Sequence, residues 1–458
     1  MVSYKEKIPS SSSRKSMSSR PGEETPLIGE PKPLSSHPKT LANFFIAIVG
    51  AGVLGMPYAF KRTGWIMGLL ILLFIAGSTT YCMMLLVQIR RKLHSVDNDN
   101  AEVNSFGDLG FAVCGTSGRL VVDVLITLSQ AGFCIGYLIF ISNTLVNLFH
   151  NEPSMNSSLN LGISRFTTKS LFIWGCFPFQ LGLNSIKTLT NLAPLSIFAD
   201  VVDIGAMGVV MVEDLRLIMK RSQEVKAFGG VSVFFYGMGV ALFGYEGIAM
   251  VLPIESEMKD NAKFGKILAL SMGLTTLMYG AFGALGYFAF GAATKDIITS
   301  NLGPGWISSM VQLGLCINLF FTFPLMMNPV YEIVERRFSG GRYCLWLRWL
   351  LVLFVSLVAL FVPNFADFLS LVGSSVCCCL GFILPGLFHL LAFKDEQGWK
   401  GCILDVGIMS FGVVLALSGT WFRDLVFSDG DIACIVKRYD FVSKEKSPNY
   451  SFESDPFL

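Results

Sequence analysis

The feature that most constrains this chain is an interruption inside its first strongly apolar stretch. Residues 41–60 are apolar enough to enter a bilayer, yet residues 50–57 read GAGVLGMP, with three glycines and a proline at mid-membrane depth. Both residue types disfavour a continuous helix. Lipid supplies no hydrogen bonds, so a broken span is tolerated only where the freed backbone is buried in protein or lines a cavity. The sequence therefore predicts two half-helices beside a cavity.

A second interruption lies about halfway along the chain. Residues 243–253 read FGYEGIAMVLP, again with glycines and a proline inside an apolar stretch. A matched pair of interrupted membrane helices is the best sequence indicator of the binding site of a secondary transporter. We therefore expect both interruptions to border one site.

The composition supports a membrane protein. The chain has 458 residues, of which 52% are hydrophobic and 15% charged, whereas an average soluble domain has about 25% charged residues. The formal net charge of +2 gives no reason to expect a nucleic-acid partner. The sequence contains no metalloprotease helix, nucleophile elbow or phosphate-binding loop. We therefore expect no enzyme, no metal and no cofactor, and any pumping must use an ion gradient.

Apolar segments of about 20 residues, the length that crosses a bilayer core of roughly 30 Å, can be placed eleven times. They cover residues 41–60, 64–89, 121–149, 170–186, 189–212, 229–253, 264–291, 305–334, 343–362, 366–393 and 401–421. Only a short connection separates the fourth and fifth segments, so counts of ten or twelve spans also fit the sequence. The loops that would lie on the same side of the membrane as the N-terminus hold more lysine and arginine than the loops on the opposite side. This bias predicts that the N-terminus is cytosolic. The predicted fold class is an all-α polytopic membrane protein with about eleven transmembrane helices.

The polar ends of the chain form separate regions. Residues 1–40 are rich in serine and proline, which predicts a disordered cytosolic tail; residues 41–421 form the transmembrane domain, and residues 422–458 form a polar C-terminal tail. In the first tail, Glu23, Leu27 and Ile28 have the spacing of an acidic dileucine signal read by sorting adaptors. The match predicts a vacuolar or lysosomal membrane, and the alternative is chance similarity in a polar segment.

The broken backbone indicates what the site binds. A half-helix that begins near Gly52 would direct its free N–H groups into the cavity, where they suit a carboxylate. Carbonyl groups freed at Ile48, Val49, Phe243 and Gly244 could accept from an ammonium group, so together the breaks match an α-amino acid zwitterion. The predicted substrate contacts are Ile48, Val49, Gly50, Ala51, Gly52, Phe243, Gly244, Tyr245 and Gly247. The alternative is that these glycines only let helices approach, as we expect of the GxxxG pairs Gly64/Gly68 and Gly132/Gly136.

Side-chain selectivity is expected from residues of the third, sixth and eighth spans. The candidates are Tyr137, Tyr245 and Asn318.

Ionisable residues inside spans are costly, so each one is a functional hypothesis. Glu246 lies within the second interruption and is the strongest candidate for a proton-coupling group; the alternative is a structural acceptor of freed backbone N–H groups. Asp123, Asp200 and Asp203 are further coupling candidates, or else interfacial residues that pair with Lys187.

Three blocks of sequence resemble a known family. Residues 41–65 read LANFFIAIVGAGVLGMPYAFKRTGW, residues 177–214 read FPFQLGLNSIKTLTNLAPLSIFADVVDIGAMGVVMVED, and residues 244–259 read GYEGIAMVLPIESEMK. They resemble the amino acid/auxin permease family, in particular its plant vacuolar amino acid transporter branch, which is related to animal proton-coupled amino acid transporters. The resemblance covers roughly residues 23–421.

This resemblance implies a 5+5 inverted repeat with broken helices 1 and 6, plus an eleventh helix. It also implies proton-coupled movement of small neutral amino acids from the vacuole to the cytosol across the tonoplast. The chain departs from the animal members at Asn43, where they have a histidine, so the proton must be carried elsewhere. The alternative function is an amino acid sensor, or transceptor, that signals through its cytosolic tail.

Overall fold

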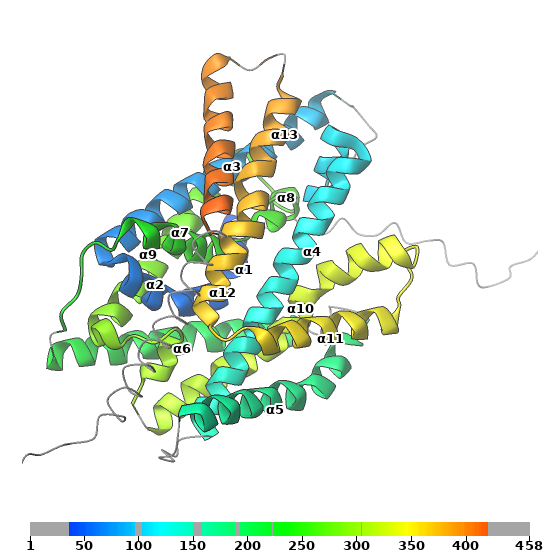
Figure 1. The fold of residues 1–458 in the computed structure, drawn as a ribbon. Coiled ribbons are helices and arrows are strands. Elements are labelled where there is room, and N and C mark those ends of the chain that lie inside the picture. Colours follow the sequence, from blue (N-terminus) through cyan, green and yellow to red (C-terminus); the bar gives the residue numbers. More distant parts are fainter. Residues whose placement is uncertain are drawn as a thin grey trace, which may run out of the picture. The chain divides into compact units, whose positions relative to one another are not determined.

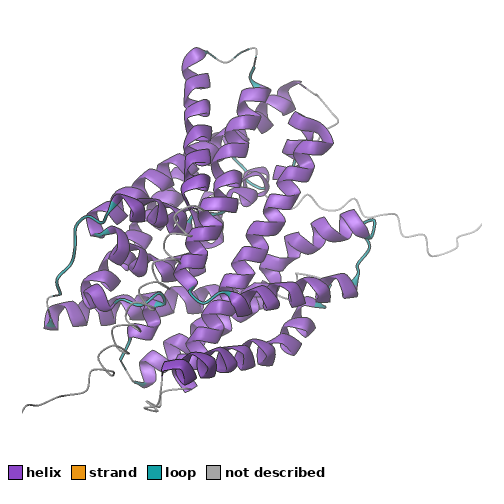
Figure 2. Cartoon of the chain, in the orientation of Figure 1, coloured by secondary structure: helices purple, strands orange, loops and turns teal. Residues whose placement is uncertain are grey.

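The computed structural model describes residues 36–96, 103–149, 158–187, 193–221, 223–303, 305–394, 396 and 398–419. Within these ranges all regular secondary structure is helical (Figure 2). The all-α class predicted from the sequence is therefore confirmed. The dileucine match and the C-terminal tail lie outside the described residues.

The first apolar segment is broken where the glycines predict. Helix α1 (His37–Ile48) ends before Gly50, which is extended, with φ −154° and ψ −161°. A short 3-10 turn, η1 (Ala51–Gly55), then leads into α2 (Met56–Thr63). The two halves are bent by 49° relative to each other.

The second interruption has the same layout. Helix α7 (Val231–Gly244) ends at the first glycine of the motif, Gly247 is non-helical with φ −173° and ψ 8°, and the 3-10 turn η3 (Ile248–Met250) leads into α8 (Val251–Ser256). The last turn of α8 is fixed to α3 through Glu255, which is buried and lies 2.8 Å from Arg90 and 3.0 Å from Arg91. Each broken segment therefore presents an irregular backbone between two short helices.

The remaining predicted segments also fall on helices, coloured along the chain in Figure 1. They are α3 (Trp65–Val96), α4 (Phe106–Phe149), α5 (Ser158–Asn184), α6 (Ala193–Lys220), α9 (Phe264–Phe290), α10 (Trp306–Phe338), α11 (Leu345–Phe361), α12 (Phe365–Val372), α13 (Leu384–Ala392) and a final helix, Trp399–Gly419. Among the described residues, seven helices are long and apolar enough to cross a membrane, or eight if the bent pair is one span. The count of eleven and the 5+5 repeat therefore stay predictions.

Helix α4 begins earlier than its predicted span, which starts at residue 121. Its first arm reaches Gly115, whose φ of +62° turns the chain before the long arm starts. The arms touch where Gly110 faces Gly118, and Arg119 lies 3.2 Å from Asp108 across the elbow. The predicted span misses the first arm because this arm is far shorter than the roughly 20 residues that cross a bilayer.

Helix α7 contacts several of the helices around the two breaks. It packs against α2, α3 and α12, and a side chain at Gly373 would overlap the carbonyl oxygen of Gly239, so the backbones of α7 and the tenth segment touch. Helix α10 packs against α4 and α6. These contacts bring the two breaks, α4, α6 and α10 around one space.

Candidate functional site

A cavity of about 390 Å³ lies between the two interruptions, within the range of small-molecule sites, roughly 300–1,000 Å³. Its walls come from α1, η1, α4, α6, α7, η3 and α10. Of the predicted substrate contacts, Ile48, Val49, Gly50, Ala51, Gly52, Phe243, Gly244 and Gly247 line it. The expectation that both breaks border one space therefore agrees with the geometry.

Tyr245 is placed differently from the other predicted contacts. Its side chain is fully buried behind the cavity wall, where its hydroxyl donates to Thr276 of α9 at 2.9 Å. The other two selectivity candidates, Tyr137 and Asn318, do line the cavity. Tyr245 therefore supports the second break without facing the space.

Tyr279 of α9 joins the two breaks, a role that the sequence patterns did not predict. Its hydroxyl lies 3.1 Å from the carbonyl oxygen of Ile48 and 3.0 Å from that of Gly244, the last residues of the two half-helices. One hydroxyl proton is shared between these acceptors. Two of the carbonyl groups expected to be free are therefore bound within the protein, and the Phe243 carbonyl accepts from the Glu246 N–H at 3.4 Å.

Two carboxyl groups border the cavity, and no lysine, arginine or histidine does so among its described lining residues. Asp203 reaches it from α6 and is 6% exposed; Glu246 reaches it from the second break and is 9% exposed. The Oε1 atom of Glu246 is buried, and the described part of the chain offers it no hydrogen-bond partner. Such a group is costly to bury as an anion.

The rest of the described wall is mostly apolar, both aliphatic and aromatic, with a few uncharged polar groups. Phe133 and Phe243 meet edge to face with ring centroids 4.7 Å apart. Asn318 accepts a hydrogen bond from Thr322, and Gln130, which was not among the predicted site residues, also lines the space. Gln130 lies on the same face of α4 as Phe133, but periodicity alone does not show which face meets the breaks.

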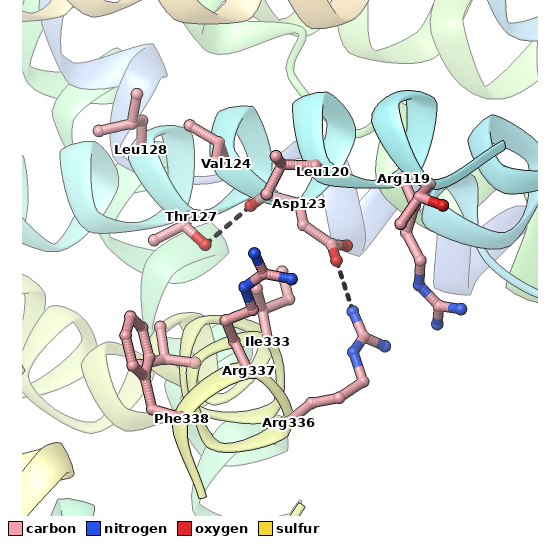
Figure 3. Close-up of a pocket in the computed structure, with 12 residues that line it drawn as sticks. Arg119, Leu120, Asp123, Val124, Thr127, Leu128, Ile333, Arg336, Arg337 and Phe338 are labelled. Atoms are coloured by element: carbon pink, nitrogen blue, oxygen red, sulfur yellow. Dashed lines mark hydrogen bonds and ion pairs between the residues drawn. The ribbon is translucent and has the colours of Figure 1, made fainter. Parts of the chain in front are cut away.

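One of the other coupling candidates, Asp123, is not at the cavity. Asp123 lies 2.7 Å from Arg336 of α10, in a separate pocket (Figure 3). Asp200 belongs to α6, but its side chain lies outside the described residues. His389, a titratable residue of the tenth predicted segment that was not among these candidates, is buried and lies 2.6 Å from Asp405 of the last helix. It does not line the cavity.

The cavity extends to one side of the breaks. From α1 it includes residues before the break, and from α10 it includes Leu325, Met326 and Pro329 in the C-terminal half. Both of these helix ends are predicted to be cytosolic. On the opposite side, Arg62 at the end of α2 lies 3.4 Å from Asp367 of α12. The described lining of the cavity thus extends toward the predicted cytosolic ends of these helices and not toward this ion pair.

A family model of the transmembrane amino acid transporter proteins matches residues 34–423. The chain belongs to this family. It is 68% identical over 407 residues to amino acid transporter AVT3B of Arabidopsis thaliana, covering 88% of this chain and 96% of that protein. It is 26% identical over 410 residues to vacuolar amino acid transporter 3 of Schizosaccharomyces pombe, covering 86% of this chain and 60% of that one. The predicted family is confirmed, and it is a family of transporters rather than enzymes.

One solved structure has a fold similar to that of this chain. The crystal structure of MhsT in complex with L-phenylalanine matches with a TM-score of 0.51 at 13% identity, covering 86% of this chain and all of that chain. At this identity the likeness concerns the fold alone.

Proposed function

We propose that this chain is a secondary active, proton-coupled transporter of small neutral amino acids that exports them from the vacuole to the cytosol. The observation that carries the proposal is the cavity between the two breaks, with the buried carboxyl of Glu246 on its wall. Membership of the amino acid transporter family supports the substrate class.

The backbone at the first break supports the binding of both ends of the substrate. The 3-10 turn η1 has no side-chain cap, so the N–H groups at Ala51 and Gly52 suit the substrate carboxylate. Since the Ile48 and Gly244 carbonyls already accept from Tyr279, the Val49 carbonyl is the best acceptor for the ammonium group. A small side chain would then face Tyr137 and Phe243.

Glu246 is our first choice for the proton carrier, because a buried carboxyl on a cavity wall can exchange protons through the cavity, while its neutral form avoids the cost of burial. Asp203 is the second choice, since it also borders the cavity. Asp123 and Asp200 stay lower-ranked hypotheses. A pH difference of two units supplies about 2.7 kcal/mol per proton, enough for roughly a hundredfold gradient of a neutral substrate.

Further arguments support the direction of transport and the membrane in which the protein lies. Relatives in yeasts carry the name vacuolar amino acid transporter, and the dileucine spacing of Glu23, Leu27 and Ile28 would recruit a sorting adaptor. With the N-terminus in the cytosol, the cavity would face the cytosol, the side of release. A proton gradient from an acidic lumen would drive this direction.

Transport by the purified protein in proteoliposomes tests the proposal. A panel of labelled amino acids should show counterflow of the small neutral ones, and a protonophore should abolish their accumulation in response to an imposed pH gradient. Binding without counterflow would instead favour the amino acid sensor. Accumulation that is insensitive to the protonophore would rule out proton coupling while leaving transport intact.

A further inference from the structure

A second pocket, of about 540 Å³, lies between α4 and α10 and is separate from the cavity at the breaks (Figure 3). It is positioned where α4 leaves its elbow and where α10 ends. The predicted third span starts at residue 121 and the eighth ends at residue 334, so the pocket straddles the expected membrane boundary. Apart from Asp123, a lower-ranked hypothesis for the proton carrier, no residue of this pocket has a part in the proposed transport mechanism.

The outer rim of this pocket is basic. Arg119 comes from α4, and Arg336 and Arg337 come from the last turn of α10, from which both project toward α4 in Figure 3. One carboxylate, Asp123, lies among them and pairs with Arg336 at 2.7 Å. Arg119 pairs across the elbow with Asp108, whereas Arg337 has no ion pair among the described residues. The rim therefore carries excess positive charge.

The inner wall of the pocket is apolar and exposed. Leu120 is 47% exposed, Val124 48% and Leu128 50%, and these residues follow one another by one turn along α4. Phe338, at the end of α10, is 77% exposed. In a chain that spans a membrane, such a stripe faces lipid chains rather than water. Basic groups at the boundary and an apolar stripe below them match the two parts of a phospholipid.

We propose that this pocket binds a phospholipid with an anionic headgroup. The headgroup phosphate would accept hydrogen bonds from Arg337 and Arg119, because guanidinium groups bind phosphate in a bidentate manner, and an acyl chain would lie along Leu120, Val124 and Leu128. Basic pockets between transmembrane helices are suited to such headgroups. Charge complementarity favours this occupant over a zwitterionic lipid, whose ammonium group the arginines would repel.

The occupied pocket would also tie two walls of the transport cavity together. Helices α4 and α10 supply Gln130 and Asn318 to that cavity, and at the pocket they are joined by the Asp123–Arg336 pair. A headgroup that contacts both helices would add to this connection. The lipid site is nevertheless independent of which substrate is carried.

Native mass spectrometry of the full-length protein tests the proposal, with phosphatidylinositol 4-phosphate and phosphatidylcholine as probes at equal concentration. We expect retention of the anionic lipid only, and about fivefold weaker retention for each arginine removed in Arg119→Gln and Arg337→Gln. Arg342→Gln is the matched control, because Arg342 is exposed near the same end of α10 but does not line the pocket. If Arg342→Gln lowers retention of the anionic lipid equally, the arginines act only through general surface charge, and the proposed site is wrong.

Two further measurements separate a lipid seated in the pocket from a headgroup held by charge alone. Val124→Trp keeps every arginine but fills the apolar wall, and since Val124 is half exposed the substitution should leave folding intact; it should lower retention. The soluble headgroup without acyl chains should not compete at equal concentration. If it competes fully, or if Val124→Trp retains lipid as the wild type does, the pocket is not a phospholipid site.

Discussion

A side chain at Gly52 would place its Cβ 2.7 Å from the Cα of Gly244, so the two interruptions touch backbone to backbone. Real Cβ atoms do not approach other atoms so closely, and backbone on both sides leaves little room to yield. Gly52 is thus needed where the broken segments cross, in addition to the predicted role beside a substrate carboxylate. Gly50 differs, because a Cβ there would meet only the Tyr137 hydroxyl, at 3.9 Å.

This difference makes the two glycines a matched pair of tests. Gly52→Ala should destabilise the protein by about 1–3 kcal/mol through overpacking and lower transport with it. Gly50→Ala should leave thermal stability within about 0.5 kcal/mol, since the extended backbone at this position suits any residue, but raise KM by intruding on the cavity. Melting of the detergent-solubilised variants and uptake kinetics measure both. An unchanged KM in Gly50→Ala would argue against substrate binding at the first break.

Removing the Tyr279 hydroxyl should loosen the junction of the two breaks. Tyr279→Phe leaves the carbonyl groups of Ile48 and Gly244 without this donor, which we expect to cost about 1–2 kcal/mol and to slow transport. Tyr245→Phe is the control, because the Tyr245 ring lies 5.4 Å away but its hydroxyl contacts Thr276, outside the cavity. Equal melting temperatures and rates for the two variants would show that the bridge has no special role.

The sequence was sufficient to predict the breaks because glycine and proline act locally. Residues 50–57 and 243–253 mark irregular backbone through their own φ preferences and missing donors, and lipid makes such backbone rare outside a site. The packing prediction for the pairs Gly64/Gly68 and Gly132/Gly136 depends instead on the missing side chain. A Cβ at Gly68 or Gly132 would press on Phe60 or Val372, at 2.9 and 3.0 Å, whereas a Cβ at Gly136 would meet nothing closer than 3.9 Å and Gly64 ends α2 with a φ of +86°.

Contacts between distant parts of the chain were not predictable in this way. Asp123 is a plausible coupling group by its depth in the third span, but its partner Arg336 follows 213 positions later. Tyr279 looks like any aromatic residue of an apolar helix until the fold brings it to both breaks. Hydropathy gives the depth of a residue in the membrane, whereas the rotation of its helix depends on packing.

We expect the ion pair between Arg62 and Asp367, across the breaks from the predicted cytosolic side, to restrain opening there. Arg62 and Asp367 lie 3.4 Å apart and are about one-fifth exposed, so Asp367→Asn should remove up to roughly 1 kcal/mol and shift the population severalfold toward opening on that side. Labelling of Val53→Cys by a membrane-impermeant maleimide measures this, because Val53 is fully buried beside the break. Glu213→Gln, which breaks an ion pair within α6 alone, should leave the labelling rate unchanged. Faster labelling in Glu213→Gln, or no increase in the labelling rate in Asp367→Asn, would contradict the prediction.

The dileucine spacing in the N-terminal tail predicts a sorting phenotype. Replacing Leu27 and Ile28 by alanine should move the protein from the vacuolar membrane toward the cell surface, since an adaptor would lose its apolar contacts. Fluorescence microscopy of tagged protein in plant cells reads this directly, with Pro31→Ala as a control in the same tail. Unchanged localisation would mean that the match is accidental.

Proton coupling can be separated from substrate movement at Glu246. Glu246→Gln keeps the shape of the side chain but removes its titration, so accumulation driven by a pH gradient should be lost. Counterflow should persist in part, because a loaded carrier with a permanently neutral group can still reorient. Uptake by proteoliposomes with and without a pH gradient distinguishes the two activities.

The control for this last substitution is Glu257→Gln, which removes an exposed carboxyl just after α8 and should change neither activity. If Glu246→Gln accumulates substrate with normal dependence on pH, its buried carboxyl is structural. Asp203→Asn then becomes the decisive variant, because Asp203 is the other acidic residue among the described residues of the cavity wall. If both variants lose counterflow as well as accumulation, the two carboxyl groups serve substrate binding rather than the proton, and the coupling group must be sought outside the cavity.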